Sequence, residues 1–177
     1  LATLETLNCD YQLIDTEEKR KEIIQKLLTT EILSIDTETT GTEPMDAELV
    51  GMSFSIAENE AFYVPVPADQ EEALKIVNEF RPVFENENSL KVGQNIKYDM
   101  IVLQNYGVQV KGPLFDTMIA HYVLQPELRH GMDYLAEIYL RYQTIHIDEL
   151  IGPKGKNQKN MRDLDPKDVY LYACEDA

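Results

Sequence analysis

Two hydrophobic periods alternate along the chain, the helical period and the two-residue period of strands. The apolar residues between positions 23 and 28 have helical spacing. They predict an amphipathic helix that ends near Thr29, with Asp15 and Glu18 as a capping box at its start. The apolar run at 32–35 predicts a short buried strand. Strands and helices continue to alternate beyond it, which is typical of an α/β layered fold.

Turn and cap residues divide the rest of the chain into further elements. A hairpin with one buried face is predicted at 50–56 and 62–64, and Pro65 and Pro67 end it. The remaining predicted elements are a helix capped by Asp69 and Glu72, a strand at 90–92, a helix from Asn95 to Gly107, a strand at 114–115, a helix from Asp116 to Leu124, a helical segment at 132–140 and a last helix from Asp165.

The chain has 177 residues, which is about one domain's worth. No repeat or low-complexity stretch divides it. The last helical pattern, with Pro166 at its first position, is still running at Ala177 with no glycine or cap. We therefore expect residues 1–177 to form a single domain that is excised from a longer chain and cut within its last helix.

The composition is that of an ordinary soluble globular protein, with 44% hydrophobic and 27% charged residues. No apolar run is long enough to span a membrane, and residues 1–5 lack the basic start of a signal peptide. Cys9 and Cys174 offer neither a disulfide framework nor the spacing of a zinc site. We expect a cytoplasmic monomer with no membrane partner.

The strongest compositional signal is acidic charge. There are 32 Asp and Glu residues against 16 Lys and Arg residues, a formal net charge of -16. A nucleic-acid binder usually has a basic face, so composition argues against one unless the acids bind metal ions or a neighbouring domain supplies that face. One local stretch is basic. Its residues Lys154, Lys156, Lys159 and Arg162 form either a solubilising surface loop or a phosphate-contacting loop.

Carboxylates also occur at three places where folding alone does not require them. Asp36 and Glu38 follow an apolar strand at i and i+2, so both point to the same face. Tyr172 and Asp176 share a face of the last predicted helix, and Asp99 lies on an earlier one. Taken singly, each has a structural reading as a turn residue or a solvated helix residue. If the four acids converge, divalent cations would relieve their repulsion, and their oxygens suit Mg²⁺ or Mn²⁺.

Four motifs follow one another in the order Asp-Thr-Glu-Thr at 36–39, Gly-Gln-Asn-Ile-Lys-Tyr-Asp at 93–99, Phe-Asp-Thr-Met at 115–118 and Tyr-Ala-Cys-Glu-Asp at 172–176. With the stretches at 129–133 and 152–158, the chain resembles the 3′–5′ exonuclease domain of bacterial DNA polymerase I. It resembles the branch of the DEDD exonucleases whose last motif carries Tyr. The resemblance covers essentially the whole chain. It implies a ribonuclease-H-like α/β fold, a mixed central sheet with one antiparallel hairpin strand and helices on both faces.

The resemblance also implies roles for the acids. Asp36, Glu38 and Asp176 would bind the tighter of two divalent ions, Mg²⁺ or Mn²⁺, with Zn²⁺ as a further candidate at that site. Asp36 would bridge to the second ion, which Asp99 would support largely through water. Tyr172 would aim the attacking hydroxide, and Glu38 would help to orient it.

Five further positions match DNA contacts of that family. Gln94 and Asn95 match residues that contact the DNA backbone near the scissile end, and Arg129 matches a phosphate contact. Thr42 and Ile147 stand where the family has a Leu and a Phe that grip the last bases. Because Thr42 offers less apolar surface, we expect a weaker grip on a frayed end.

The implied function is a two-metal 3′–5′ exonuclease that removes nucleotides from single-stranded DNA 3′ ends. It would serve a polymerase domain that lies C-terminal in the parent chain. Two alternatives stay open. An RNase D-like exoribonuclease shares the four acids and the tyrosine, and a structural module of the polymerase would do no chemistry. Since all four acids and the tyrosine are present, we expect an active site.

Overall fold

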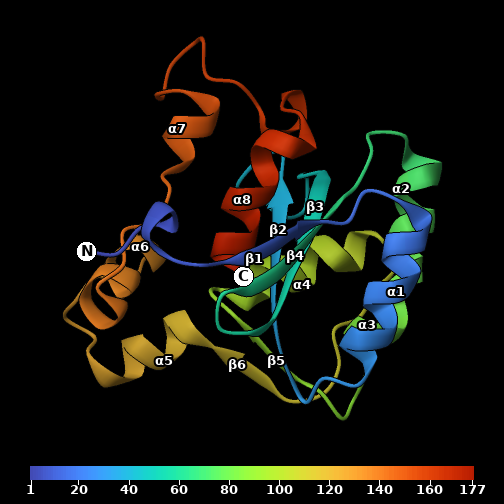
Figure 1. Cartoon of the computed structure of the whole chain (residues 1–177), viewed down its shortest axis with the longest axis horizontal. Coiled ribbons are helices and arrows are strands. Elements are labelled where there is room, and N and C mark those ends of the chain that lie inside the picture. Colours follow the sequence, from blue (N-terminus) through green and yellow to red (C-terminus); the bar gives the residue numbers. More distant parts are fainter.

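The computed structural model describes residues 1–177, and a six-stranded mixed sheet lies at its centre (Figure 1). The strand order is β1-β4-β3-β2-β5-β6. Their bounds are β1 (Asp10–Leu13), β2 (Ile32–Thr39), β3 (Leu49–Ala57), β4 (Glu60–Pro65), β5 (Leu90–Gly93) and β6 (Leu114–Asp116). Strand β3 is antiparallel to both of its neighbours, whereas the other neighbouring pairs are parallel. The predicted mixed sheet with one antiparallel hairpin strand is confirmed.

Helices cover both faces of this sheet. They are α1 (Glu17–Leu28), α2 (Gln70–Glu79), α3 (Arg81–Phe84), α4 (Ile96–Asn105), α5 (Thr117–Leu124), α6 (Met132–Leu135), α7 (Ile147–Ile151) and α8 (Pro166–Asp176). A main core of 22 buried residues joins one face of the sheet to α1, α2, α3 and α4. A second cluster of 7 buried residues lies between the other face and α8, which crosses the sheet in Figure 1.

Strand β2 lies in the middle of the sheet and supplies residues to both layers. Leu33 and Ile35 are buried in the main core, whereas the alternate residues Asp36 and Glu38 share the face that α8 covers. The apolar run predicted a strand at 32–35 only. The strand continues to Thr39 because β3 pairs with it over that whole stretch. Both acids are therefore held inside a sheet and not on a loose strand end.

The predicted capping box at the start of α1 is wrong. Thr16 is the N-cap, and its hydroxyl accepts a hydrogen bond from the Lys19 backbone N–H. Thr16 has the extended backbone of an N-cap, so the helix begins one residue later than Asp15 would allow. The Asp15 carboxylate instead pairs with the Lys19 ammonium group at 2.8 Å.

The predicted caps of α2 and α8 are confirmed. The Asp69 carboxylate accepts a hydrogen bond from the backbone N–H of Glu72, and that of Asp165 accepts one from Lys167. Pro166 occupies the first turn of α8, where its missing N–H costs nothing. The start of α8 is thereby set, and with it the direction in which each later residue of the helix points.

One carboxylate caps two helices at once. Asp116 accepts hydrogen bonds of 2.9–3.1 Å from the backbone N–H groups of Asn95, Ile96, Met118 and Ile119. The prediction that Asp116 caps α5 is confirmed. The prediction that a helix opens at Asn95 is confirmed, because Asn95 is the N-cap residue of α4, but with its left-handed backbone (φ 59°) its side chain makes no capping bond. Asp116 therefore ties the start of α4, and Asp99 on its first turn, to β6.

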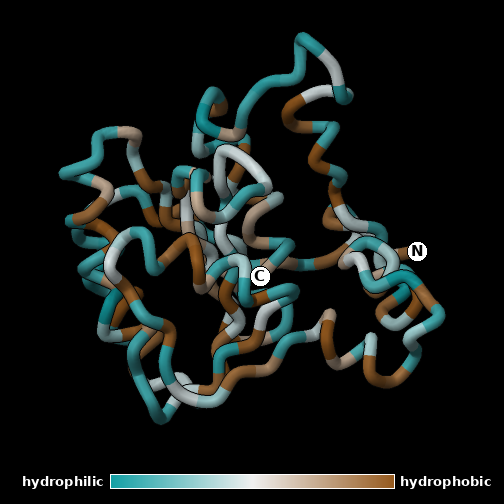
Figure 2. Tube along the Cα trace, turned by 180° about the vertical axis from the view of Figure 1, so that it is seen from behind, coloured by the Kyte–Doolittle hydropathy of each residue, from teal (hydrophilic) through white to brown (hydrophobic).

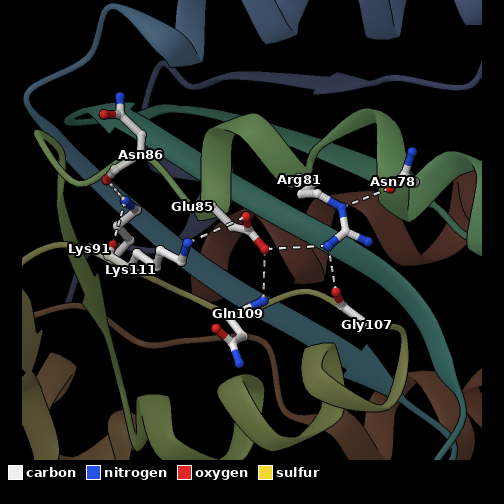
Figure 3. Close-up of polar contacts among 8 residues, drawn as sticks. All are labelled: Asn78, Arg81, Glu85, Asn86, Lys91, Gly107, Gln109 and Lys111. Atoms are coloured by element: carbon white, nitrogen blue, oxygen red, sulfur yellow. Dashed lines mark hydrogen bonds and ion pairs between the residues drawn. The ribbon is translucent and has the colours of Figure 1, made fainter.

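A buried lysine anchors the segments around β5 (Figure 3). Lys91 is fully buried, and its ammonium group donates to the carbonyl oxygens of Asn86 and Lys111. Beside it, the Glu85 carboxylate accepts a hydrogen bond from the Gln109 backbone N–H and lies 3.8 Å from the Lys111 ammonium group. These contacts join α3 and β5 to the segment that follows α4.

Three short elements were missed by the sequence patterns, β1, α3 and α7. Strand β1 alternates only exposed and half-buried residues, because Asp10 and Gln12 stand where a buried strand would have apolar side chains. Helices α3 and α7 have 4 and 5 residues, too few for a helical period to be recognised. The helical segment predicted at 132–140 is confirmed, as α6 followed by a π-helical turn at Ala136–Leu140.

Helix α5 keeps much of its apolar surface exposed. Val123 and Leu124 are 72% and 78% exposed, and Ile119 and Tyr122 are more than half exposed. Figure 2 shows apolar stretches on this side of the molecule, apart from the central core. None of the eight helices combines the length and the apolar character that crossing a bilayer requires.

We expect Asp116→Ala to lower the free energy of unfolding by roughly 2–4 kcal/mol, because four backbone N–H groups lose their acceptor and a single cap is worth about 1 kcal/mol. Asp69→Ala is the matched control. It removes one capping bond from α2 and should cost about 1 kcal/mol. Urea unfolding measures both losses, and equal losses would contradict the double cap.

Candidate active site

Three carboxylates from two distant parts of the chain meet at one point. Asp36 and Glu38 come from β2, and Asp176 comes from the last turn of α8. One oxygen of each lies within 4.8 Å of the others. Glu38 is buried, with 6% of its surface exposed, and the other two residues are half-buried. The fold therefore brings together three of the four predicted acids, which we call the acid cluster.

The strand next to Glu38 has a glycine whose missing side chain leaves room for a buried tyrosine ring. Gly51 on β3 pairs directly with Glu38 on β2. A Cβ atom at Gly51 would lie 2.2 Å from the Tyr63 hydroxyl oxygen, so a larger residue would displace the buried Tyr63 ring. Burial raises the pKa of Tyr63, and the charge of Glu38 adds to that rise. The Tyr63 ring therefore occupies the space of a side chain at position 51 and lies close enough to Glu38 to respond to its charge.

Burial and mutual repulsion raise the pKa values of the acid cluster. Burial is the largest cause for Asp36, followed by the charges of Asp99 and Glu38. Burial and the charge of Asp176 raise the pKa of Glu38 well above its usual value. Burial also raises the pKa of Asp176 to about 7, against the effect of a hydrogen bond from Tyr172. At neutral pH the three groups therefore compete for protons unless a positive charge joins them.

Asp99, the fourth predicted acid, lies beside the cluster. It is buried on the first turn of α4, and its carboxylate accepts a hydrogen bond of 2.6 Å from the Thr37 hydroxyl. Burial raises the pKa of Asp99 to about 6, and this hydrogen bond opposes the rise. Among the neighbouring charges, that of Asp99 has the largest effect on the pKa of Asp36. Asp99 is therefore close to Asp36 but outside the group of three converging oxygens.

Tyr172 lies one helical turn before Asp176 on α8 and is half-buried. Burial raises the pKa of Tyr172, and the charges of Asp176 and Glu38 raise it further. The phenol therefore keeps its proton at neutral pH and acts as a hydrogen-bond donor at the edge of the acid cluster.

The donor set of the acid cluster fits a divalent cation. All of the converging atoms are carboxylate oxygens, the hard donors that Mg²⁺ and Mn²⁺ prefer. No lysine, arginine or histidine side chain forms an ion pair with Asp36, Glu38 or Asp176, because every ion pair of the structure involves another acid. A bound cation would supply the missing positive charge and lower the pKa values that burial has raised.

A polar groove of about 740 Å³ adjoins the acid cluster at Glu38. It lies over the segment that follows β2 and beside α7. Its lining includes three of the five predicted DNA contacts, Thr42, Asn95 and Ile147. Thr42 is exposed, and Ile147 is 41% exposed on the first turn of α7. The groove therefore offers an open approach to the cluster.

Gln94 and Arg129, the other two predicted contacts, lie outside this groove. Gln94 lines a second hollow of about 540 Å³ that adjoins Asp176. Its side-chain amide donates to the His130 carbonyl oxygen at 2.7 Å and accepts from the Thr117 hydroxyl. Arg129 is exposed in the loop before α6 and lines neither hollow. Gln94 therefore holds the loop that carries Arg129 next to β5.

Two residues that shape the groove were missed by the sequence patterns. The Tyr98 hydroxyl hydrogen-bonds the Thr39 hydroxyl and the Gly41 carbonyl oxygen. The Asn160 side-chain amide donates to the Thr40 carbonyl oxygen at 2.8 Å. Tyr98 could have been suspected from its place beside Asp99 in the motif at 93–99. Nothing near Asn160 in the sequence points to a partner 120 positions away.

The interpretation of Arg162 as part of a basic loop is wrong. Its guanidinium group donates to the carbonyl oxygens of Val66 and Leu49, which follow or begin strands of the sheet. A side chain thus supplies the donors for these two carbonyl groups, so Arg162 serves the fold. Lys154, Lys156 and Lys159 remain as the exposed cations of that stretch.

Comparisons with known proteins give one family and one fold. A family model described as 3′-5′ exonuclease matches residues 11–177. The chain is 33% identical to DNA polymerase I of Borreliella burgdorferi over 178 residues, which cover 99% of this chain and 19% of that protein. It spans about a fifth of the length of the curated relatives that it matches best in coverage.

Two solved structures illustrate the fold. Escherichia coli RNase D, an exoribonuclease involved in structured RNA processing, has a TM-score of 0.70 at 17% identity, with 95% of this chain and 41% of that chain covered. Brucella melitensis NrnC with bound Mg²⁺ has a TM-score of 0.66 at 18% identity, with 97% and 75% covered. At these identities the likeness concerns the fold alone, and it confirms the predicted ribonuclease-H-like architecture.

The raised pKa of Asp176 predicts how stability without metal depends on pH. The folded protein holds this proton up to a pKa of about 7, against 3.8 for an ordinary Asp, so the free energy of unfolding falls as pH rises between these values. Three pKa units correspond to about 4 kcal/mol. Because Asp176 is partly exposed, we expect on the order of 2 kcal/mol, or about 4–8 °C in Tm.

Asp176→Asn isolates this contribution from the other carboxylates. In EDTA the variant should unfold at the same temperature as the wild type near pH 4 and at a higher temperature at pH 8. Thermal unfolding across this pH range measures the difference. Added Mn²⁺ should stabilise the wild type at pH 8 more than the variant, because the variant lacks one ligand. A difference between the two proteins that does not change with pH would contradict the raised pKa of Asp176.

Proposed function

The chain belongs to the 3′–5′ exonuclease family, and on that premise we propose that it hydrolyses the terminal phosphodiester at the 3′ end of single-stranded or frayed DNA and releases nucleoside monophosphates. The observation that carries this proposal is the acid cluster. The fold brings Asp36 and Glu38 on β2 together with Asp176 on the last helix, α8. An open polar groove adjoins this cluster at Glu38. Such a site can hold cations next to a phosphate, which is what phosphodiester hydrolysis requires.

In this proposal Asp36, Glu38 and Asp176 hold one divalent ion, Mg²⁺ or Mn²⁺ with Zn²⁺ as a further candidate, and Asp99 supports a second ion that Asp36 shares. Two such ions supply, when bound, an activated water and the positive charge that stabilises the phosphate in the transition state. The oxygen donor set, the raised pKa values and the Mg²⁺ reported with Brucella melitensis NrnC, a protein of the same fold, support this assignment.

Tyr172 and Glu38 position the attacking water. Tyr172 keeps its proton at neutral pH, so it acts as a hydrogen-bond donor and not as a base. Glu38 is buried beside it, and its carboxylate can accept a hydrogen bond from the water or from the terminal 3′-hydroxyl. The two side chains together restrict where the water lies relative to the scissile phosphate.

The strand enters through the groove. Asn95 lies where it can contact the backbone, and Thr42 and Ile147 flank the last bases. Ile147 supplies apolar contact, whereas Thr42 supplies less than a larger apolar side chain would. Both amide atoms of Gln94 already have partners, so Gln94 contributes by holding the loop that presents Arg129 to a phosphate.

DNA is the favoured substrate because the relative that shares 33% identity is a DNA polymerase, whereas RNase D shares the fold at 17%. The same relative is about five times longer than the chain, which supports a role beside a polymerase domain in one protein. That domain would also supply a basic surface that this acidic chain lacks. An exoribonuclease and a structural module without chemistry are the two other outcomes that the assay below distinguishes.

Degradation of 5′-labelled single-stranded DNA in Mn²⁺ tests the function. We expect stepwise shortening from the 3′ end that stops in EDTA. Asp36→Ala should reduce the rate about 10³-fold or more, because several kcal/mol of charge stabilisation depend on the ions that Asp36 holds. Tyr172→Phe should reduce it about tenfold, the scale of one lost hydrogen bond.

Glu71→Ala, an exposed acid on α2, is the control and should leave the rate unchanged. Full activity in Asp36→Ala would place the chemistry elsewhere. Faster shortening of an RNA of the same sequence would favour the exoribonuclease. Absence of cleavage together with absence of Mn²⁺ binding by calorimetry would leave the structural module.

A further inference from the structure

We propose that Lys154 and Lys159 form a phosphate subsite that holds the substrate strand upstream of the scissile bond. This proposal rests on the proposed function and names the part of the chain that binds the rest of the strand. The two lysines line the same polar groove as Glu38. They belong to residues 152–160, which connect α7 to the 3₁₀ turn at Met161–Asp163.

Neither lysine is used by the fold. Both side chains are exposed, and neither forms an ion pair or donates a side-chain hydrogen bond. Lys19, Lys21 and Lys26 differ in this respect, because each lies within 2.8 Å of a carboxylate oxygen. In a chain with a net charge of -16, two unpaired ammonium groups on one groove wall are free to bind an anionic partner from outside.

The charges along the groove suit a polyanion of more than one phosphate. Apart from the two lysines, its charged lining residues are Glu38 and Asp148. Cations at the acid cluster can neutralise the scissile phosphate, but they do not reach phosphates further along the strand, since salt screens charges over about 8–10 Å. Lys154 and Lys159 are the only positively charged residues that line the groove, so they supply the counter-charge for those phosphates.

The loop is tied to the site at one end, which fixes where Lys159 lies. The backbone N–H of Lys159 donates to the Ile151 carbonyl oxygen at 2.8 Å. The next residue, Asn160, donates to the Thr40 carbonyl oxygen, two residues beyond Glu38. The loop itself protrudes beyond α7 in Figure 1 and is hydrophilic in Figure 2. Lys159 therefore lies at the anchored base of this loop, and Lys154 lies earlier in it.

Lys156 provides a matched control within the same loop. It is exposed, as Lys154 and Lys159 are, but it does not line the groove. Any effect of net charge alone would be the same for all three lysines, whereas a subsite effect would be confined to the two that line the groove.

The test compares a 12-nucleotide DNA with a dinucleotide, whose only phosphodiester is the scissile one. In the double variant Lys154→Ala/Lys159→Ala we expect KM for the longer strand to rise about tenfold with kcat unchanged, and hydrolysis of the dinucleotide to stay at the wild-type level. The salt dependence of binding should become shallower by about 1.4 in log–log slope, about 0.7 for each phosphate contact with a single strand. Lys156→Ala should change none of these quantities.

Equal losses in Lys156→Ala, or an equal loss on the dinucleotide, would overturn the subsite. Failure of the proposed function gives a different result. If the wild type cleaves neither substrate, binding of the labelled 12-nucleotide strand in Ca²⁺, followed by fluorescence anisotropy, still compares the two variants. Thermal unfolding of each variant should match the wild type, since none of the three side chains packs in the fold.

Discussion

The repulsion among Asp36, Glu38 and Asp176 is the constraint on which the rest of the structure depends. Carboxylates in contact with water would turn away from one another, and their pKa values would stay near the usual range. Here they cannot turn away. Strand β2 pairs along the acids with β3, and the side of α8 next to Asp176 packs Ala173 and Cys174 against the sheet. Because the backbone is held on both sides, burial and, after it, repulsion raise the pKa values of Asp36 and Glu38.

The second requirement is that loops next to the cluster keep their places without a core of their own. Hydrogen bonds between side chains and distant backbone achieve this. Asp116 fixes the start of α4, and Thr37 then holds the carboxylate of Asp99. Tyr98 and Asn160 bind the segment at 39–41 from opposite parts of the chain. Each of these hydrogen bonds joins residues that are far apart in the sequence. The order of the site therefore depends on the fold that brings them together.

That difference explains which features could be predicted from the sequence. The hairpin of β3 and β4 and the caps Asp69 and Asp165 depend on neighbouring residues, and the patterns identified them. The spacing of Asp36 and Glu38 predicted their common face for the same reason. Spacing could not say that α8 would cover that face. Only the order of the motifs, which resembles that of a known family, suggested that Asp36 near the start of the chain and Asp176 near its end would meet.

Features that depend on tertiary contacts escaped the patterns. Gly51 looks like any glycine in a strand until the ring of Tyr63 is seen to occupy the space of its side chain. Arg162 belongs to a basic stretch of the sequence, but its guanidinium group donates hydrogen bonds to carbonyl oxygens at the ends of sheet strands. Asn95 is of a residue type that often caps helices, yet its backbone is left-handed and its side chain makes no capping bond. The Asp116 carboxylate accepts the backbone N–H of Asn95 instead. In each case a partner far along the chain overrode the local preference.

The same reasoning applies to charge. A formal charge of -16 argues against binding a polyanion only if every acid acts on it. At physiological ionic strength, charges more than about 8 Å apart are largely screened, so most surface acids do not act on the groove. Among the acids that do act, those of the acid cluster lie where cations can neutralise them, while Lys154 and Lys159 stay unpaired on the groove wall. The net charge of the chain therefore does not decide whether a nucleic-acid strand can bind. The arrangement of the few charged groups along the groove decides where it would bind.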